Sequence, residues 1–234
     1  MIEYKITGVD VSIEKNSSKL LGPVSFELVN SNCTIVLGPN GAGKTSFLRL
    51  LHGLDKPTTG SITWDPSAKI EEQSFVFQSP VILKRNVIEN VYYPLMLKGI
   101  SKKEAITQAE YWLERTSLNH KAYEPAISLS GGEKQRMVIA RSLISNPKLI
   151  FLDEPTVNLD GKSKSQIEKL LKQVINNGTK IIMATHDLGQ AKRLGNDILF
   201  LHHGKLLEVG SATSFFENPK TKEGLTFLRG EILQ

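Results

Sequence analysis

One stretch of the chain combines the residue types and the spacing that bind phosphate. Its residues are Gly38, Pro39, Asn40, Gly41, Ala42, Gly43, Lys44 and Thr45, followed by Ser46. Glycines let the backbone curl so that successive N–H groups point at one anion, and a following helix adds the positive end of its dipole. In such a loop Lys44 would reach the β- and γ-phosphates of a nucleotide, and the Thr45 hydroxyl would bind Mg²⁺.

The flanking sequence distinguishes a phosphate-binding loop from a turn that matches by chance. Residues 33–37 are uncharged and rich in β-branched side chains, which is typical of a short buried strand. From residue 46 onward apolar residues recur at helical spacing, and the run ends at Gly53. Strand, glycine-rich loop and helix in this order favour the phosphate-binding loop.

A second apolar run, residues 149–152, ends in two carboxylates, Asp153 and Glu154. Such endings are common, and one of them alone favours a structural role. In a chain with a phosphate-binding loop, however, an aspartate at this position holds Mg²⁺, and we assign this role to Asp153. Glu154 would face the γ-phosphate and polarise the attacking water as a general base.

A second glycine-containing helix start lies at residues 129–136. Ser130 precedes Gly131 and Gly132, and Glu133 would favour the positive end of the helix dipole. By itself this is a plausible N-cap. The segment could also bind phosphate, but one nucleotide needs only one such cradle. A second cradle is explained if two chains pair, so that this segment of each chain covers the nucleotide held by the other.

The elements that must position these residues alternate between strands and helices. Strands are expected at residues 2–14, 24–29, 61–64, 74–77, 149–152, 180–184, 198–201 and 206–209, with a hairpin loop at 15–19. Helical patterns cover residues 82–145 and 162–176, and a short helical end follows the last hairpin. Strand centres without charges indicate strands covered on both faces.

This alternation, together with the P-loop, predicts an α/β fold with a mostly parallel sheet and flanking helices. An antiparallel β subdomain and an inserted helical lobe complete it. We expect a single domain over residues 1–234, with the nucleotide-binding core at 1–81 and 146–234 and the helical lobe at about 82–145.

Composition limits the class of protein. The 234 residues are 40% hydrophobic and 23% charged, as in soluble globular proteins, and the formal net charge is +5. The lysines are scattered rather than interleaved with aromatic residues, so solvated helix faces explain the charge better than nucleic acid does. No apolar run approaches membrane-spanning length, the opening residues do not resemble a signal peptide, and a cytoplasmic chain is expected. Cys33, the single cysteine, is expected to be buried.

The motifs together resemble the ATP-binding subunits of ABC transporters, in the family's order and over nearly the whole chain. The matching segments are the Walker A loop at 38–45, the Q-loop at Gln78, the signature at 129–135, the Walker B strand at 149–154, the D-loop at 158–160 and the switch histidine at His186. The resemblance implies a P-loop ATPase core, with ATP and Mg²⁺ as cofactors.

The resemblance also implies roles for residues that the pattern alone would make structural. Gln78 would contact Mg²⁺ and water and relay the nucleotide state to a membrane subunit, although a polar residue that merely ends a strand is the simpler alternative. His186 would hydrogen-bond the γ-phosphate rather than only end a buried strand. Asp160 can cap the following helix and serve the D-loop at once.

One departure from the family concerns adenine. Relatives usually have a stacking aromatic residue in the loop before the strand at residues 24–28, whereas residues 14–19 contain no aromatic and Tyr4 comes too early. Aliphatic packing from Ile13 or the stem of Lys15 would replace it.

Within the family, the sequence favours an importer subunit. Exporters more often carry membrane helices in the same chain, and ABC ATPases that act on nucleic acid usually have a long insertion or two P-loop halves. The apolar residues of 80–94, beyond those needed for a core, suggest a surface for a membrane partner. The implied partners are a second copy or close paralogue, integral membrane permease subunits and, indirectly, an extracytoplasmic solute-binding protein, at the cytoplasmic face of the membrane.

The transported solute leaves no direct mark on this chain. The compact ending at 215–231 is similar to compact importers of oxyanions, and the stretch 77–85 is similar to importers of tungstate and the related molybdate. Phosphate, amino-acid and lipoprotein-related systems remain open alternatives.

Overall fold

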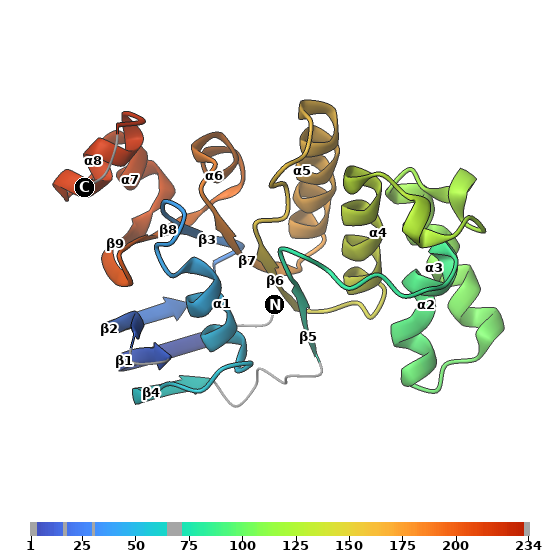
Figure 1. Cartoon of the computed structure of the whole chain (residues 1–234), viewed down its shortest axis with the longest axis horizontal. Helices are drawn as coiled ribbons and strands as arrows, with labels where there is room; N and C mark the ends of the chain where they lie inside the picture. The colour runs from blue at the N-terminus through green and yellow to red at the C-terminus, as the bar shows by residue number, and fades with distance from the viewer. Residues whose placement is uncertain (1–3, 16–17, 30, 65–71, 232–234) are drawn as a thin grey trace. The chain divides into compact units, whose positions relative to one another are not determined.

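The computed structural model describes residues 4–15, 18–29, 31–64 and 72–231 (Figure 1). The chain divides into two units, each described by itself below. The first comprises Met1–Lys69, Phe151–Glu154 and Lys180–Gln234, and the second comprises Ile70–Ile150 and Pro155–Thr179.

The described residues of the first unit form two sheets. A three-stranded antiparallel sheet has the order β2-β1-β4, with β1 at Lys5–Lys15, β2 at Ser18–Val29 and β4 at Thr59–Trp64. In the other sheet, β3 (Cys33–Leu37) pairs in parallel with β7 (Lys180–Thr185) and β8 (Asp197–His202). The strand β9 (Lys205–Ser211) pairs antiparallel with β8, and the end of β6 (Leu149–Asp153) lies beside β7.

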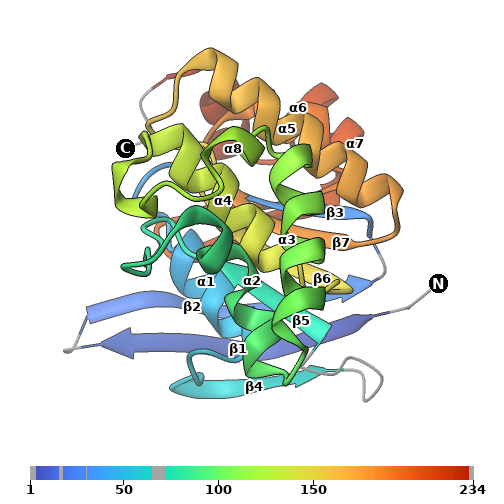
Figure 2. The ribbon, with the colours of Figure 1, turned by 90° about the vertical axis from the view of Figure 1, so that its right-hand side faces the viewer.

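The helix α1 (Lys44–His52) lies between these two sheets, in contact with β2, β3 and β7 (Figure 2). Its Phe47 is fully buried and meets Phe26 of β2 edge to face, with ring centroids 5.0 Å apart. Every residue of β3 and β7 is buried, as the uncharged strand centres predicted. The phosphate-binding loop is therefore anchored at both ends in packed core.

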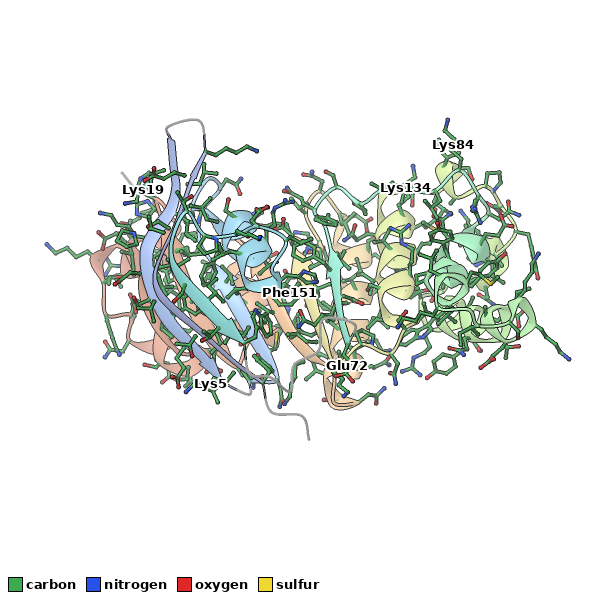
Figure 3. All side chains as sticks on the ribbon, turned by 90° about the horizontal axis from the view of Figure 1, so that it is seen from below. Lys5, Lys19, Glu72, Lys84, Lys134 and Phe151 are labelled. Atoms are coloured by element: carbon green, nitrogen blue, oxygen red, sulfur yellow. The ribbon has the colours of Figure 1, made fainter. Side chains whose placement is uncertain are left out.

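Elsewhere in this unit, an aromatic side chain illustrates the buried core and two lysine side chains illustrate the exposed surface. Phe151 lies inside it, edge to face with His52 and Trp64, whereas Lys5 and Lys19 lie on its outside (Figure 3). The described residues of the unit also include the helices α6 (Leu188–Leu194), α7 (Ala212–Glu217) and α8 (Lys222–Leu228).

The second unit is mainly helical. Its elements are β5 (Gln73–Val76), α2 (Val87–Leu97), α3 (Lys102–Arg115), the short 3-10 helices Asn119–Lys121 and Ala126–Ser128, α4 (Gly131–Leu143) and α5 (Gly161–Asn176). α2, α3 and α4 pack on one another, and α4 also contacts α5. Each of these longer helices starts at a side-chain cap of the expected type: Asn86, Ser101, Ser130 and Asp160.

The expected fold class is confirmed, with differences at particular boundaries. The strand expected at 24–29 already begins at Ser18, because β2 continues through Gly22 and Pro23, where its register against β1 shifts. The expected hairpin loop at 15–19 is wrong at Lys15, which ends β1, and at Ser18 and Lys19, which begin β2. Its residues 16–17 lie outside the described part of the chain, as do residues 2–3 of the first expected strand. Helix α6 was not predicted, because a run this short lacks a readable period, although Asp187 at its N-cap was a usable signal.

Replacing Phe47 by alanine tests the packing of α1 between the sheets. We expect Phe47→Ala to lower the free energy of unfolding by about 3–5 kcal/mol, because a buried aromatic side chain leaves a cavity. Urea titration of both proteins measures this change. As a control, Val81→Ala, at a side chain 72% exposed, should change it by less than about 0.5 kcal/mol; equal effects of the two changes would contradict the packing.

Candidate nucleotide-binding site

The segment between β3 and α1 has the backbone of an anion-binding loop. Gly41 and Gly43 adopt φ values of +79° and +96°, which favour glycine. At Gly38 an added Cβ would lie 2.1 Å from the carbonyl oxygen of Leu201, so only glycine lets the loop pass this close to β8. The predicted strand, loop and helix are thus present in the expected order.

The N-terminus of α1 is free to receive an anion. Its N-cap, Gly43, has no side chain, and no acidic residue occupies its first turn. The first N–H groups of a helix have no partner within the helix, and the dipole adds positive potential there. A phosphate would satisfy both features.

Lys44 and Glu154 form a buried ion pair at this loop. Lys44 Nζ lies 3.2 Å from Glu154 Oε1, and the two side chains are 7% and 8% exposed. The same ammonium donates to the carbonyl oxygens of Gly38, at 2.9 Å, and Pro39, at 3.0 Å. The cation is therefore held inside the curl of the loop, where a phosphate chain would meet it.

His186 approaches the same carboxylate from the end of β7. Its Nδ1 lies 3.0 Å from both carboxylate oxygens of Glu154, and its side chain is 41% exposed. The Glu154 backbone adopts a φ of +47° and donates its N–H to the carbonyl of Ala184 in β7. One carboxylate is thus shared by a lysine and a histidine, a contact that no spacing in the sequence indicates.

Thr45 and Asp153 supply oxygen ligands next to this group. The Thr45 hydroxyl donates to Asp153 Oδ1 at 3.1 Å. Burial raises the pKa of Asp153, and the hydrogen bond from Thr45 opposes that rise. A hydroxyl and a carboxylate are the hard oxygen donors that Mg²⁺ takes when substrate phosphates complete its coordination, so the pair fits this ion. No cluster of three or more His, Cys, Asp or Glu suited to a metal occurs in the described part of the chain.

A cavity of about 530 Å³ adjoins the loop. It is lined by Pro39, Asn40, Gly41, Ala42, His186, Leu188, His202, His203, Phe227, Gly230 and Glu231. The side of the loop near His186 is therefore open to a ligand.

The predicted signature segment starts α4 in the second unit. Ser130 and Glu133 form a reciprocal capping box, in which each side chain accepts a hydrogen bond from the other's backbone N–H. Glu133 also pairs with Lys121 Nζ at 2.7 Å. At Gly132 an added Cβ would lie 2.5 Å from Ser163 Oγ, so a glycine is required where α4 meets α5.

Asp160 and Gln78 also lie in the second unit. Asp160 caps α5 by accepting from the N–H and the hydroxyl of Ser163, which confirms its expected N-cap role. Gln78 follows β5 and is exposed. The expected contact of Gln78 with Mg²⁺ stays a prediction.

The two residues expected to replace an adenine-stacking aromatic residue, Ile13 and Lys15, differ in solvent exposure. Ile13 is 8% exposed and belongs to the core, whereas Lys15 is exposed at the end of β1. Residues 16–17 of this hairpin lie outside the described part.

Comparison with known proteins identifies the family. The sequence pattern described as "ABC transporter" matches residues 21–157, and the chain belongs to this family. It is 33% identical to the arginine transport ATP-binding protein ArtM of Bacillus subtilis (strain 168), over 93% of this chain and 98% of that protein. It is 35% identical to the tungstate uptake system ATP-binding protein TupC of Peptoclostridium acidaminophilum, over 91% of this chain and 100% of that protein.

Among solved structures, the chain is similar to the dimeric post-hydrolysis state of the ATP-binding cassette MJ0796 bound to ADP and Pi. The TM-score is 0.77 at 28% identity, covering 88% of this chain and 98% of that one. The chain is accordingly an ATP-hydrolysing enzyme of the ABC class. Among the described residues, no helix has the length and apolar character needed to cross a bilayer.

The stabilisation of α4 by the Ser130–Glu133 capping box is expected to depend on pH. Hydrogen bonds from Lys121 and from the Ser130 backbone lower the pKa of Glu133 to about 2 from its ordinary 4.5. The folded chain thus favours the ionised form, so its stabilisation is complete above about pH 4.5 and is lost as the pH falls toward 2. Glu133→Gln should lower the free energy of unfolding at pH 7 by roughly 0.5–1 kcal/mol, as for partly exposed ion pairs.

Denaturant titration at several pH values checks this expectation. The difference between the two proteins should shrink between pH 5 and pH 3. A difference that stays constant over this range would show that the charge of Glu133 does not stabilise α4.

Proposed function

We propose that this chain binds and hydrolyses ATP to power an ABC importer, and that its cargo is tungstate or a related oxyanion such as molybdate. The observation that carries the ATPase part is the Glu154 carboxylate shared by Lys44 and His186 at a phosphate-binding loop. The oxyanion part rests on the similarity to TupC and on the sequence of residues 77–85.

Each residue of the site has a chemical task in this proposal. Residues 38–46 cradle the phosphates through backbone N–H groups, and Lys44 neutralises their charge. Glu154 orients the attacking water and takes its proton, because its carboxylate is buried next to the loop. His186, whose Nδ1 contacts the same carboxylate, hydrogen-bonds the γ-phosphate. When bound by Thr45 and Asp153, with Gln78 as a further contact, Mg²⁺ supplies positive charge at the β- and γ-phosphate oxygens.

We further propose that the site is completed by a second chain, a copy or a close paralogue. Ser130, Gly131 and Gly132 would face the γ-phosphate held by the partner, with Glu133 keeping the helix start in shape. The start of α4 at Gly131 and Gly132, which have no side chains to block an anion, supports this role, as does the dimeric state of the structural relative that binds ADP and Pi.

A membrane partner is proposed for the second unit. Val81 and Leu97 are 72% and 71% exposed, although large apolar side chains in contact with water promote unwanted association. Within the expected stretch 80–94, which ends before Leu97, the apolar residues Val87, Ile88 and Val91 are buried core of α2. The exposed ones would contact integral membrane permease subunits at the cytoplasmic face, and an extracytoplasmic solute-binding protein would act through those subunits.

A second cargo class is favoured by a specific observation. The chain is about as similar to ArtM, whose name specifies arginine transport, as it is to TupC. An amino-acid importer is therefore the alternative cargo for the same ATPase.

Lysine 44 is predicted to be essential for nucleotide affinity. Lys44→Ala should abolish detectable ATP binding, because it removes the cation inside the loop and leaves Glu154 facing the phosphates. Isothermal titration with ATP and Mg²⁺ measures the affinity, with Lys169→Ala on the exposed face of α5 as the control. Unchanged affinity in Lys44→Ala would contradict the cradle.

Glutamate 154 is predicted to act after binding. Glu154→Gln keeps the size and hydrogen-bonding oxygen of the side chain but cannot accept a proton from water. We expect turnover to fall at least about 100-fold, the lower end of general-base effects, while ATP-driven dimerisation persists. Phosphate release and size-exclusion chromatography with ATP measure the two properties; robust turnover would remove Glu154 from the base role.

The cargo is tested in cells of the source organism fed a panel of trace oxyanions. Replacing the chain by Glu154→Gln should selectively reduce accumulated tungsten or molybdenum in elemental analysis. Unchanged metal content together with reduced arginine uptake would instead establish the amino-acid alternative, and the ATPase assignment would stand in either case.

A further inference from the structure

The last turn of α4 contains an arginine whose hydrogen bonds go to neutral oxygen atoms. Arg141 donates from Nη2 to the carbonyl oxygen of Val81, at 2.9 Å, and from Nη1 to the side-chain oxygen of Asn90, at 3.4 Å. Neither acceptor carries a charge. The guanidinium therefore fixes the chain at Val81 against the end of α4.

Asn90 extends this anchor along the chain that follows Val81. Its side chain is fully buried, and its side-chain oxygen also accepts from the N–H of Leu83 at 3.0 Å. Its amide nitrogen donates to the carbonyl oxygen of Leu83 at 3.2 Å. Both backbone groups of Leu83 are thus bound to one side chain of α2, and this side chain is in turn bound to Arg141.

The chain on the other side of Gln78 is bound to the next residue of the same helix turn. In β5, the Ser74 hydroxyl donates to the carbonyl oxygen of Ser142 at 2.9 Å. β5 ends two residues before Gln78, and residues 77–79 are exposed. The residues around Gln78 therefore form a short loop whose two ends, at Ser74 and Val81, are both held by the end of α4.

The other end of α4 carries the signature segment. The helix begins at Gly131 with Ser130 as its N-cap and continues to Leu143, a length of about 20 Å. Rigid secondary elements can carry a displacement between distant groups. One helix thus connects Ser130 with both anchors of the loop that contains Gln78.

We propose that Arg141 is a positioning residue for Gln78, which it holds in a fixed place relative to the helix that carries Ser130. The inference rests on the function proposed above, in which Gln78 contacts Mg²⁺ and Ser130 covers the nucleotide of a second chain. Because α4 joins the two, a displacement of Gln78 at one nucleotide moves the Ser130 that covers the other. Arg141 acts through Gln78 and has no contact of its own with the nucleotide.

A spin label beside Gln78 tests this positioning without nucleotide or metal. Ser79 is exposed, and Cys33, the single cysteine, is fully buried, so a nitroxide reagent labels one site of the full chain carrying Ser79→Cys. We expect Arg141→Met to shift the spectrum toward the sharp lines of a mobile label, because one anchor of the loop is lost. An unchanged spectrum would overturn the proposal.

Arg136→Met is the matched control on the same helix. Arg136 donates to the carbonyl oxygen of Thr116 at 3.0 Å and to the side-chain oxygen of Gln166 at 2.9 Å, so it holds α4 to other segments of the second unit. Its loss should leave the label at residue 79 as immobile as before. Equal gains in mobility from the two arginine substitutions would show a general loosening of α4 and would also overturn the proposal.

Combining Arg141→Met with Gln78→Ala tests the link to the reaction. Removing a residue that supports a metal contact typically lowers activity about 10–100-fold, and we expect a loss of this size in kcat from each single variant. If Arg141 acts through Gln78, the double variant is no slower than Gln78→Ala alone. Arg141→Lys keeps a donor for the Val81 carbonyl and should recover part of the loss.

The outcomes separate this inference from the function on which it rests. Losses that multiply in the double variant, while Gln78→Ala alone is impaired, would refute the positioning role and leave the proposed role of Gln78 intact. Undiminished turnover in Gln78→Ala would refute the proposed Mg²⁺ contact and, with it, the positioning role of Arg141.

Discussion

The rest of the site depends on the contacts that the buried carboxylate of Glu154 makes with Lys44 and His186. The carboxylate lies between the ammonium of Lys44 and the imidazole of His186, with both contacts near 3 Å and only 8% of the side chain exposed. Removing one partner of a buried ion pair typically costs about 3–5 kcal/mol, because the other charge is left without compensation. The backbone must therefore hold all three groups in place before any substrate binds.

Three neighbouring strands hold these three groups in place. The loop with Lys44 follows β3, Glu154 follows β6 and His186 follows β7, and the order β6-β7-β3 brings these strand ends together. Ligand sites in parallel sheets lie outside the carboxyl ends of the strands, where side chains from several strands converge. The hydrogen bond from the Glu154 N–H to the Ala184 carbonyl holds the Glu154 backbone at its φ of +47°. Gly38 lets the loop pass close to β8. The chemistry is thus a consequence of how the strands end.

Much of this arrangement can be predicted from the sequence, for a physical reason. The loop at 38–46, the caps at Ser130 and Asp160 and the buried strands are specified by local residue types, and the sequence identifies them correctly. The pairing of His186 with Glu154 joins residues 32 positions apart and leaves no local pattern. Helix α6 is too short to show a helical period, and the part of β2 from Ser18 to Pro23 is defined by its pairing with β1. The features that the sequence does not predict depend on contacts between residues far apart in the chain, whereas the chemical types of the site residues are visible in the sequence.

The central claim is that each ATP is held by the loop of one chain and covered by Ser130 of the other. It is tested most directly by mixing two inactive chains, Lys44→Ala and Ser130→Asp. Aspartate preserves the N-cap of α4 but places a negative charge toward the γ-phosphate. A mixed dimer contains one intact combination, the loop of the Ser130→Asp chain with the signature of the Lys44→Ala chain. The account predicts that ATP hydrolysis reappears on mixing, although each variant alone is inactive. If the mixture is as inactive as its components, while size-exclusion chromatography shows that mixed dimers form, the two-chain site is wrong.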